Sequence, residues 1–164
     1  MTEPPGWLPL LISVNGEWNE VLACLYEIFE RDFKETQRIL KGKLVWWDKR
    51  ILAGDRYEEG FWHLISKIEW KTGKRLFDLR RAERLPWCGP TISHANDDCV
   101  KVWDFKEATG RLRTYVWLED WDYVIILEKR EQRMGQIFFL ITAFYVDGDS
   151  KRRNLISKFN KREK

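Results

Sequence analysis

The chain contains only two histidines, and one of them, His63, stands in the otherwise apolar segment 60–67, GFWHLISK. Drawn as a helix at about 100° per residue, the segment projects His63 and Lys67 together from one side. Its apolar side chains fall on nearly the opposite side: Phe61, Leu64, Ile65 and Ile68. A strand would mix polar and apolar residues on one face, so the pattern predicts a helix with His63 outside the core, beside a lysine.

A histidine next to a cation suits metal-free cleavage of RNA, because RNA carries its own nucleophile, the 2′-hydroxyl. The protein must remove that proton, stabilise the phosphorane and protonate the leaving 5′-oxygen. Histidine, with a usual pKa of about 6.5, can transfer protons at neutral pH, and lysine or arginine can neutralise phosphate without a metal. The positive charge of Lys67 should favour the neutral imidazole of His63, which is the form that acts as a base.

Further cationic and aromatic side chains are candidates for binding the substrate. Segment 72–87 is predicted as a short helix that ends before Pro86, with Arg80, Arg81 and Arg84 emerging together from its last turn and a half. Segment 111–118, RLRTYVWL, alternates as a strand. One face is polar and aromatic and carries Arg113, Tyr115 and Trp117. The opposite face is a core face and carries Leu112, Thr114, Val116 and Leu118. We interpret the first face as an open surface that binds RNA.

Alternation cannot orient the last long strand. Both faces of IFFLITAFYV, 137–146, are apolar, so the directions of Thr142 and Tyr145 stay open, and a threonine in such a strand is more often a satisfied core hydroxyl.

Other chemistries have little support in the sequence. Glycine-rich phosphate loops and the G-x-S-x-G elbow do not occur. The only suggestive metal-binding stretch is HANDD, which would make a metal-dependent nuclease through His94 with Asp97 or Asp98. Cys24, Cys88 and Cys99 contain no C-x-x-C pair, which argues against a disulfide framework and a structural zinc site. We therefore expect no cofactor and no metal.

Length and composition fit one domain, 1–164, in which residues 1–11 form an extended lead-in. The net charge is +3, with basic clusters at 74–84 and 149–164, and ten tryptophans offer rings on which bases can stack. No apolar run reaches the roughly 18 residues that a membrane span needs, and the start of the chain does not have the basic n-region of a signal peptide. The expected location is the cytoplasm, without membrane contact.

The pattern of elements predicts an α+β fold. An amphipathic helix covers residues 17–40, segment 43–54 is a short strand or a connector, and 88–98 is a loop. Four strands with short connections follow, giving an antiparallel meander at 99–107, 110–120, 123–131 and 135–148. A basic helix at 150–164 closes the chain. The prediction is therefore N-terminal helices packed on a four-stranded antiparallel sheet, with a C-terminal basic helix.

Several of these segments resemble nucleases of the barnase–EndoU–colicin–RelE superfamily that are associated with phages and mobile elements. The resemblance runs from about Ile12 to Arg162 and rests on EEGFWHLISK, DLRRAERLPW, VKVWDF, RLRTYVWLEDWDYVIILEKR and FFLITAFYVDG, followed by the basic helix. It implies a metal-independent ribonuclease, often a toxin, with an inhibitor or immunity protein as a possible partner.

The resemblance also implies roles for individual residues. His63 would be the catalytic histidine. The residues that would bind phosphate or stabilise charge are Lys67, Arg81 and Arg84. The resemblance also makes Thr142 a catalytic candidate instead of a core residue. With Arg80, Arg113, Tyr115, Trp117 and Tyr145 as substrate-binding residues, the expected function is an endoribonuclease that leaves 2′,3′-cyclic phosphate ends. The alternative is a non-catalytic RNA- or protein-binding module on the same fold.

Overall fold

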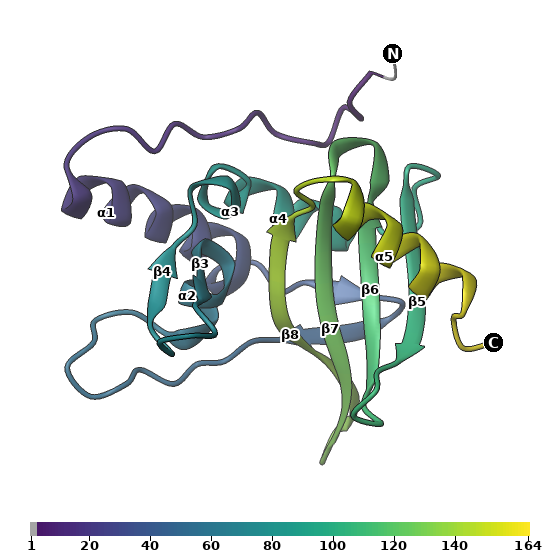
Figure 1. Cartoon of the computed structure of the whole chain (residues 1–164). Coiled ribbons are helices and arrows are strands. Elements are labelled where there is room, and N and C mark those ends of the chain that lie inside the picture. The colour runs from purple at the N-terminus through teal and green to yellow at the C-terminus, as the bar shows by residue number, and fades with distance from the viewer. Residues whose placement is uncertain (1–2) are drawn as a thin grey trace.

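Four long strands, β5 to β8, form an antiparallel meander that supports the other elements (Figure 1). The structure is a computed structural model that describes residues 3–164. Met1 and Thr2, the first two residues of the predicted lead-in, lie outside the described residues. The strands are β1 (Ile39–Leu40), β2 (Lys43–Trp46), β3 (Ser66–Ile68), β4 (Arg75–Phe77), β5 (Val100–Lys106), β6 (Leu112–Leu118), β7 (Tyr123–Gln132) and β8 (Gly135–Tyr145).

Helices precede, connect and follow the strands. They are α1 (Trp18–Phe29), the π-helix η1 (Glu30–Lys34), α2 (Glu59–Ile65), α3 (Leu79–Glu83), α4 (Leu85–Ser93), the 3₁₀ turn η2 (Glu119–Trp121) and α5 (Asp149–Asn160). The fold is thus α+β, and the predicted basic C-terminal helix is α5.

The sheet is larger than the predicted four strands and is mixed. Strand β2 pairs in parallel with β8, through Val45 opposite Phe138, and β1 pairs with β2, so six strands lie in the order β1-β2-β8-β7-β6-β5. Segment 43–54, for which a strand or a connector was expected, therefore supplies a short strand at one side of the meander. Strands β3 and β4 form a separate hairpin.

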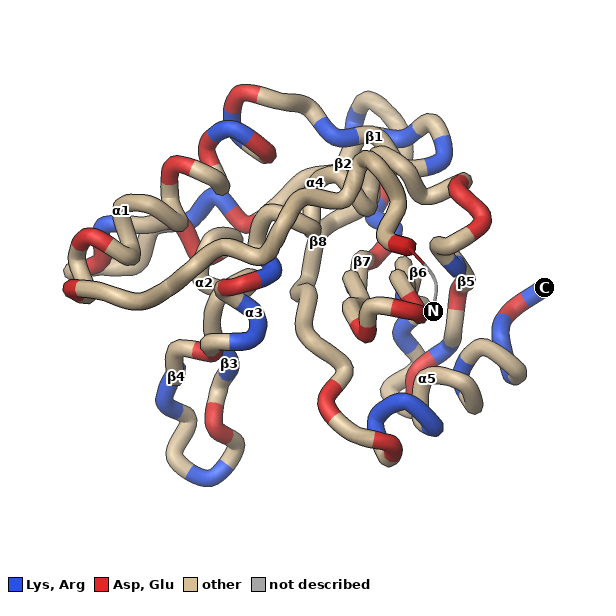
Figure 2. Tube along the Cα trace, turned by 90° about the horizontal axis from the view of Figure 1, so that it is seen from above, with Lys and Arg blue, Asp and Glu red and all other residues tan. Residues whose placement is uncertain are grey.

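The two faces of the sheet are covered by different elements. On one face, side chains such as Ile125 and Phe138 pack with Phe29 of α1, Phe61 of α2 and Ile92 of α4 in the main core. On the other face, α5 inserts Leu155 against β6 and β7, and the β3–β4 hairpin stands on the same side beyond β8 (Figure 2). We call this second face the α5 face.

The predicted helix 17–40 is too long. Its α-helical part ends at Phe29 and continues only as one π-helical turn, because the chain then folds back and its polar groups find other partners. The Thr36 hydroxyl donates to the Arg31 carbonyl at 2.7 Å, and Arg38 Nε donates to the carbonyl of the buried Asp32 at 2.8 Å. The apolar periodicity is real, but Ile39 and Leu40 belong to a strand.

Three further local predictions are wrong for reasons of turn chemistry. Segment 66–77 is a hairpin whose turn uses Gly73 at φ +71°, so α2 stops before Lys67. Of the predicted helix 72–87, residues 79–83 form α3 and residues 85–87 begin α4. Pro86 lies in the first turn of α4, where a missing N–H costs nothing, so it begins a helix that replaces much of the predicted loop 88–98.

Trp117 is a fully buried residue of the α5 face, with 0% of its surface exposed. We expect Trp117→Ala to lower the free energy of unfolding by about 3–5 kcal/mol, because it removes a large buried ring and leaves a cavity. Trp70→Ala, at a residue that is 86% exposed, should change it by less than about 0.5 kcal/mol. Urea unfolding followed by circular dichroism measures both. Equal effects of the two substitutions would contradict the burial of Trp117.

Candidate functional site

One pocket of about 310 Å³ collects side chains from five elements. His63 comes from α2, Lys67 from β3, Arg75 from β4, Arg81 from α3 and Thr142 from β8. Ser66, Ile68 and Ile141 complete its lining. Four of the predicted catalytic residues, His63, Lys67, Arg81 and Thr142, therefore lie around the same space.

Arg81 fixes the walls of this pocket. Its Nη1 donates to the Ser66 carbonyl at 2.7 Å, to the Thr142 hydroxyl at 3.0 Å and to the His63 carbonyl at 3.4 Å. The Thr142 hydroxyl donates in turn to the His63 carbonyl at 3.1 Å. Because His63 lies in the last turn of α2, its carbonyl has no intrahelical partner, and a cation at a helix C-terminus is also favourable for the helix dipole.

Thr142 reaches the pocket because β8 contains a bulge. Ile126 pairs with Thr142 and Leu127 pairs with Leu140, so Ile141 has no partner and the alternation of β8 shifts by one residue. Leu140 and Ala143 both pack in the main core, and Thr142 points to the α5 face.

His63 is half-buried, and its environment favours the neutral imidazole. Burial lowers the pKa of His63, and the positive charge of Arg75 lowers it further, while Glu59 and Asp48 act in the opposite direction. Nδ1 is buried and has no hydrogen-bond partner within residues 3–164. Nε2 is therefore the ring atom that is left to meet a ligand in the pocket.

The cation with the largest effect on the pKa of His63 is Arg75, followed by Arg50, and not the predicted Lys67. Lys67 does not share a helix with His63, because β3 begins at Ser66, and its exposed side chain makes no ion pair in the described part of the chain. Arg75 is placed by the hairpin, where its Nη1 donates to the Ser66 hydroxyl at 3.1 Å and its Nη2 lies 3.8 Å from a Glu59 carboxylate oxygen.

The three arginines of α3 and its C-cap do not emerge together. Arg84 is buried and stacks its guanidinium 4.2 Å from the centre of the Tyr145 ring, and Arg80 lies 5.8 Å from the centre of the same ring. Burial lowers the pKa of Arg84. Beyond the bulge, Tyr145 points to the opposite face from Thr142, so Arg80, Arg84 and Tyr145 form a separate stack outside the pocket.

The predicted open surface on β6 is wrong in its two aromatic residues. Tyr115 is 3% exposed and Trp117 is 0% exposed, because Leu155 and Phe159 of α5 pack over this face. The Tyr115 hydroxyl bonds to Glu107 and accepts from Lys158 Nζ at 2.8 Å, which helps to hold α5 in place. Arg113 remains partly exposed but pairs with Glu128 at 3.4 Å.

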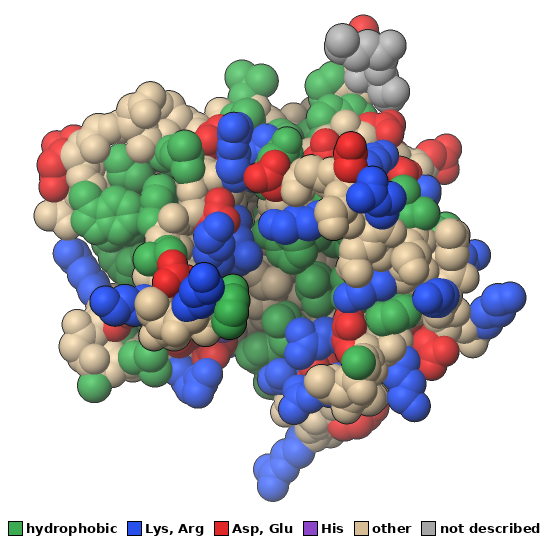
Figure 3. Space-filling view, viewed as in Figure 1, with side chains coloured by type: hydrophobic (Ala, Val, Ile, Leu, Met, Phe, Trp, Pro, Cys, Tyr) green, Lys and Arg blue, Asp and Glu red, His purple; other side chains and the backbone are tan. Residues whose placement is uncertain are grey.

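A second pocket, of about 440 Å³, lies between the sheet and α5 and shares Arg81 with the first. We call the two together the Arg81 groove. Among the described residues, every charged side chain that lines it is basic: Lys67, Arg75, Arg81, Lys151 and Lys158. Figure 3 shows this side as a hollow between the hairpin and α5, with hydrophobic side chains on its floor and Lys and Arg side chains around it. A groove with this lining attracts anions.

Two residues of HANDD, the stretch that the alternative metal-dependent nuclease would use, have other contacts. His94 Nδ1 lies 2.8 Å from the Pro90 carbonyl oxygen, its ring stacks on Trp7, and Asp97 accepts from the Trp7 indole at 2.9 Å. Across residues 3–164 no group of three or more His, Cys, Asp and Glu side chains is arranged to hold a metal ion.

No protein-family model, curated protein or solved structure matches this chain. The resemblance to the nuclease superfamily therefore rests on the sequence segments alone, and the toxin role and the inhibitor partner stay predictions. Within residues 3–164, no helix has both the length and the apolar character needed to cross a membrane.

Sequence reasoning missed Arg75, Lys151 and Lys158 as residues of the groove. A signal for Arg75 was present, since residues 68–71 alternate and Gly73 is a turn residue, but the segment after it was interpreted as helical. Lys151 and Lys158 lie seven residues apart on one face of α5, a spacing that marks them as neighbours only once the helix is docked.

The position of Arg75 predicts how the pKa of His63 responds to substitution. Arg75→Gln should raise this pKa, because it removes a positive charge that disfavours the imidazolium. Lys67→Gln, a matched change in the same hairpin, should leave it unchanged. NMR titration of the imidazole Cε1–H signal, assigned with His94→Gln, measures both. A larger shift for Lys67→Gln than for Arg75→Gln would contradict the arrangement.

Proposed function

We propose that the protein is a metal-independent endoribonuclease that cleaves RNA in the pocket of His63, Arg81 and Thr142. One observation carries the proposal: an imidazole whose pKa is lowered by burial shares a pocket with a partly buried guanidinium, in a groove whose charged lining residues are all basic. RNA fits this combination because its phosphodiester is anionic and its 2′-hydroxyl replaces a protein nucleophile.

In this proposal His63 Nε2 takes the proton of the 2′-hydroxyl as the 2′-oxygen attacks phosphorus. The bond from phosphorus to the 5′-oxygen breaks, and the leaving oxygen takes a proton from water, so the products are a 2′,3′-cyclic phosphate and a 5′-hydroxyl. Arg81 Nη2, which makes no hydrogen bond within the described residues, and the exposed Lys67 ammonium would neutralise the phosphorane. Thr142 is a positioning residue, because its single proton is donated to the His63 carbonyl.

The test is cleavage of single-stranded RNA in excess chelator. We expect cutting with 2′,3′-cyclic phosphate ends, and a loss of about 10²–10⁴-fold in kcat/KM for His63→Gln, the range typical of a general base. His94→Gln is the matched control, since His94 lies outside the groove, and should keep full activity. Full activity of His63→Gln, or cutting only with a divalent ion, contradicts the proposal.

The pH dependence follows from the lowered pKa of His63. The base acts only when neutral, so kcat/KM should fall as the pH drops through the pKa of His63, and this acid limb should lie below about pH 6.5. Arg75→Gln should move the limb to higher pH. A pH–rate profile of both proteins measures the shift, and a limb that Arg75→Gln leaves in place would exclude His63 as the titrating group.

A specific observation also favours the second candidate, a non-catalytic RNA-binding module. Arg81 Nη1 and the Thr142 hydroxyl are both used to cap backbone carbonyls, and no acceptor within residues 3–164 orients Nδ1 of His63, although a catalytic histidine is usually oriented in this way. This candidate predicts that RNA binds the groove but is not cut in chelator, and that His63→Gln leaves the affinity unchanged.

A further inference from the structure

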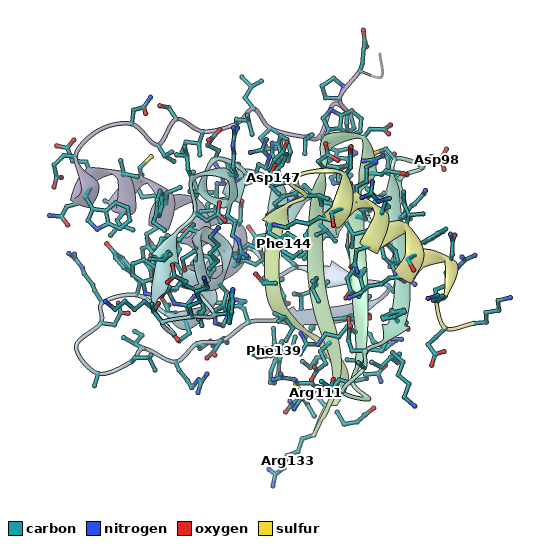
Figure 4. The ribbon with its side chains drawn as sticks, viewed as in Figure 1. Asp98, Arg111, Arg133, Phe139, Phe144 and Asp147 are labelled. Atoms are coloured by element: carbon teal, nitrogen blue, oxygen red, sulfur yellow. The ribbon has the colours of Figure 1, made fainter. Side chains whose placement is uncertain are left out.

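The second pocket of the Arg81 groove has an apolar floor and a polar rim. Tyr115, Ile126, Phe144 and Leu155 form the floor. Ser150, Lys151, Asn154 and Lys158 of α5 stand on the rim. Figure 4 places Phe144 on β8, in the region between the hairpin and α5. A volume of about 440 Å³ lies within the range of about 300–1,000 Å³ that small-molecule sites have, and an apolar lining with a few polar groups is typical of them.

The polar groups on the rim are not equally available. Lys158 is engaged, since its Nζ donates to Tyr115 at 2.8 Å and to Glu107 at 3.1 Å. The side chains of Lys151 and Asn154 are exposed and make no hydrogen bond or ion pair in the part of the chain that the structure describes. They lie three residues apart on the face of α5 that carries Leu155 into the sheet, so they point along the same edge of the pocket.

This lining matches the chemistry of a nucleoside. A base has a flat apolar face that can rest on an aromatic ring such as Phe144, and a polar edge with donors and acceptors. The Asn154 amide offers both a donor and an acceptor to such an edge. Lys151 supplies a cation for the phosphate on the far side of this nucleoside. Arg81, which lines both pockets, is the residue proposed above to hold the scissile phosphate.

We propose that this pocket binds the nucleoside next to the phosphodiester held at Arg81, with its base on Phe144 and the polar edge of the base at Asn154. The proposal rests on the proposed function in taking the ligand to be RNA, but it concerns binding and does not require cleavage.

The experiment measures binding to a single-stranded 2′-fluoro RNA hexamer, which lacks the attacking hydroxyl, by fluorescence anisotropy. Asn154→Ala should weaken binding about 2- to 10-fold, the value of one or two hydrogen bonds, and Phe144→Leu about 5-fold or more. Two matched controls should bind as the unchanged protein does. Asn160→Ala makes the same substitution in the last residue of α5, and Phe139→Leu does so on β8, where Phe139 stacks against Arg130 at 3.8 Å outside both pockets.

A second ligand separates contact with the base from contact with the phosphates. With an abasic hexamer of the same charge, the loss caused by Asn154→Ala should disappear. Because Asn154 is exposed, its substitution keeps the test valid even if Phe144→Leu destabilises the fold. Binding of Asn154→Ala that equals that of the unchanged protein, or a loss that persists with the abasic hexamer, overturns the proposal.

The outcomes also separate this inference from the proposed function. If RNA is not cut in chelator, but Asn154→Ala weakens binding of the intact hexamer and not of the abasic hexamer, the ribonuclease proposal fails and the nucleoside pocket stands. If RNA is cut through His63 and Asn154→Ala binds normally, only the nucleoside pocket fails.

Discussion

The contacts of the Arg81 guanidinium join three parts of the chain that are distant in sequence. One nitrogen, Nη1, bonds to the carbonyls of His63 and Ser66 and to the hydroxyl of Thr142, and Nε lies 3.4 Å from Asp78. These contacts attach the end of α2 and the start of the hairpin to β8. The position of His63 in the pocket depends on them, because its own carbonyl is one of the acceptors.

This arrangement also makes the site suitable for an anion. Burial lowers the pKa of Arg81, because removing its positive charge from water is unfavourable. The contact with Asp78 offsets only part of that cost, since Asp78 is itself partly exposed and its carboxylate lies near only one guanidinium nitrogen, Nε. A phosphate at Nη2 would add a charge-assisted hydrogen bond at the least solvated cation of the groove. The residue that holds the fold together at this point is thus also the one best placed to bind a ligand.

The sequence predicted what depends on local periodicity. The four strands of the meander and α5 follow from alternation and from helical spacing, and they occur where they were expected. Alternation left the direction of Thr142 open, because both faces of the run are apolar. The bulge at Ile141, which shifts the phase of β8, leaves no clear mark in such a run. The spacing of His63 and Lys67 predicted that the two side chains lie together, but for an incorrect reason: both line one pocket, although α2 ends between them.

Long-range packing accounts for the other errors. Alternation correctly separated Tyr115 and Trp117 from the core face of β6. The sequence does not state that Leu155 and Phe159 of α5 cover these two residues, and that contact converts a predicted binding surface into a second core. It also moves the groove to the edge of α5, where Lys151 and Asn154 become the exposed polar residues.

The central claim is that a phosphodiester binds between Arg81 and His63. A crystal structure of the protein with a short 2′-fluoro RNA tests it most directly. The account predicts a phosphate oxygen about 2.7–3.2 Å from Arg81 Nη2, with the 2′-position of the preceding ribose facing His63 Nε2. RNA bound elsewhere on the molecule, with the pocket of His63 and Arg81 empty, would contradict it.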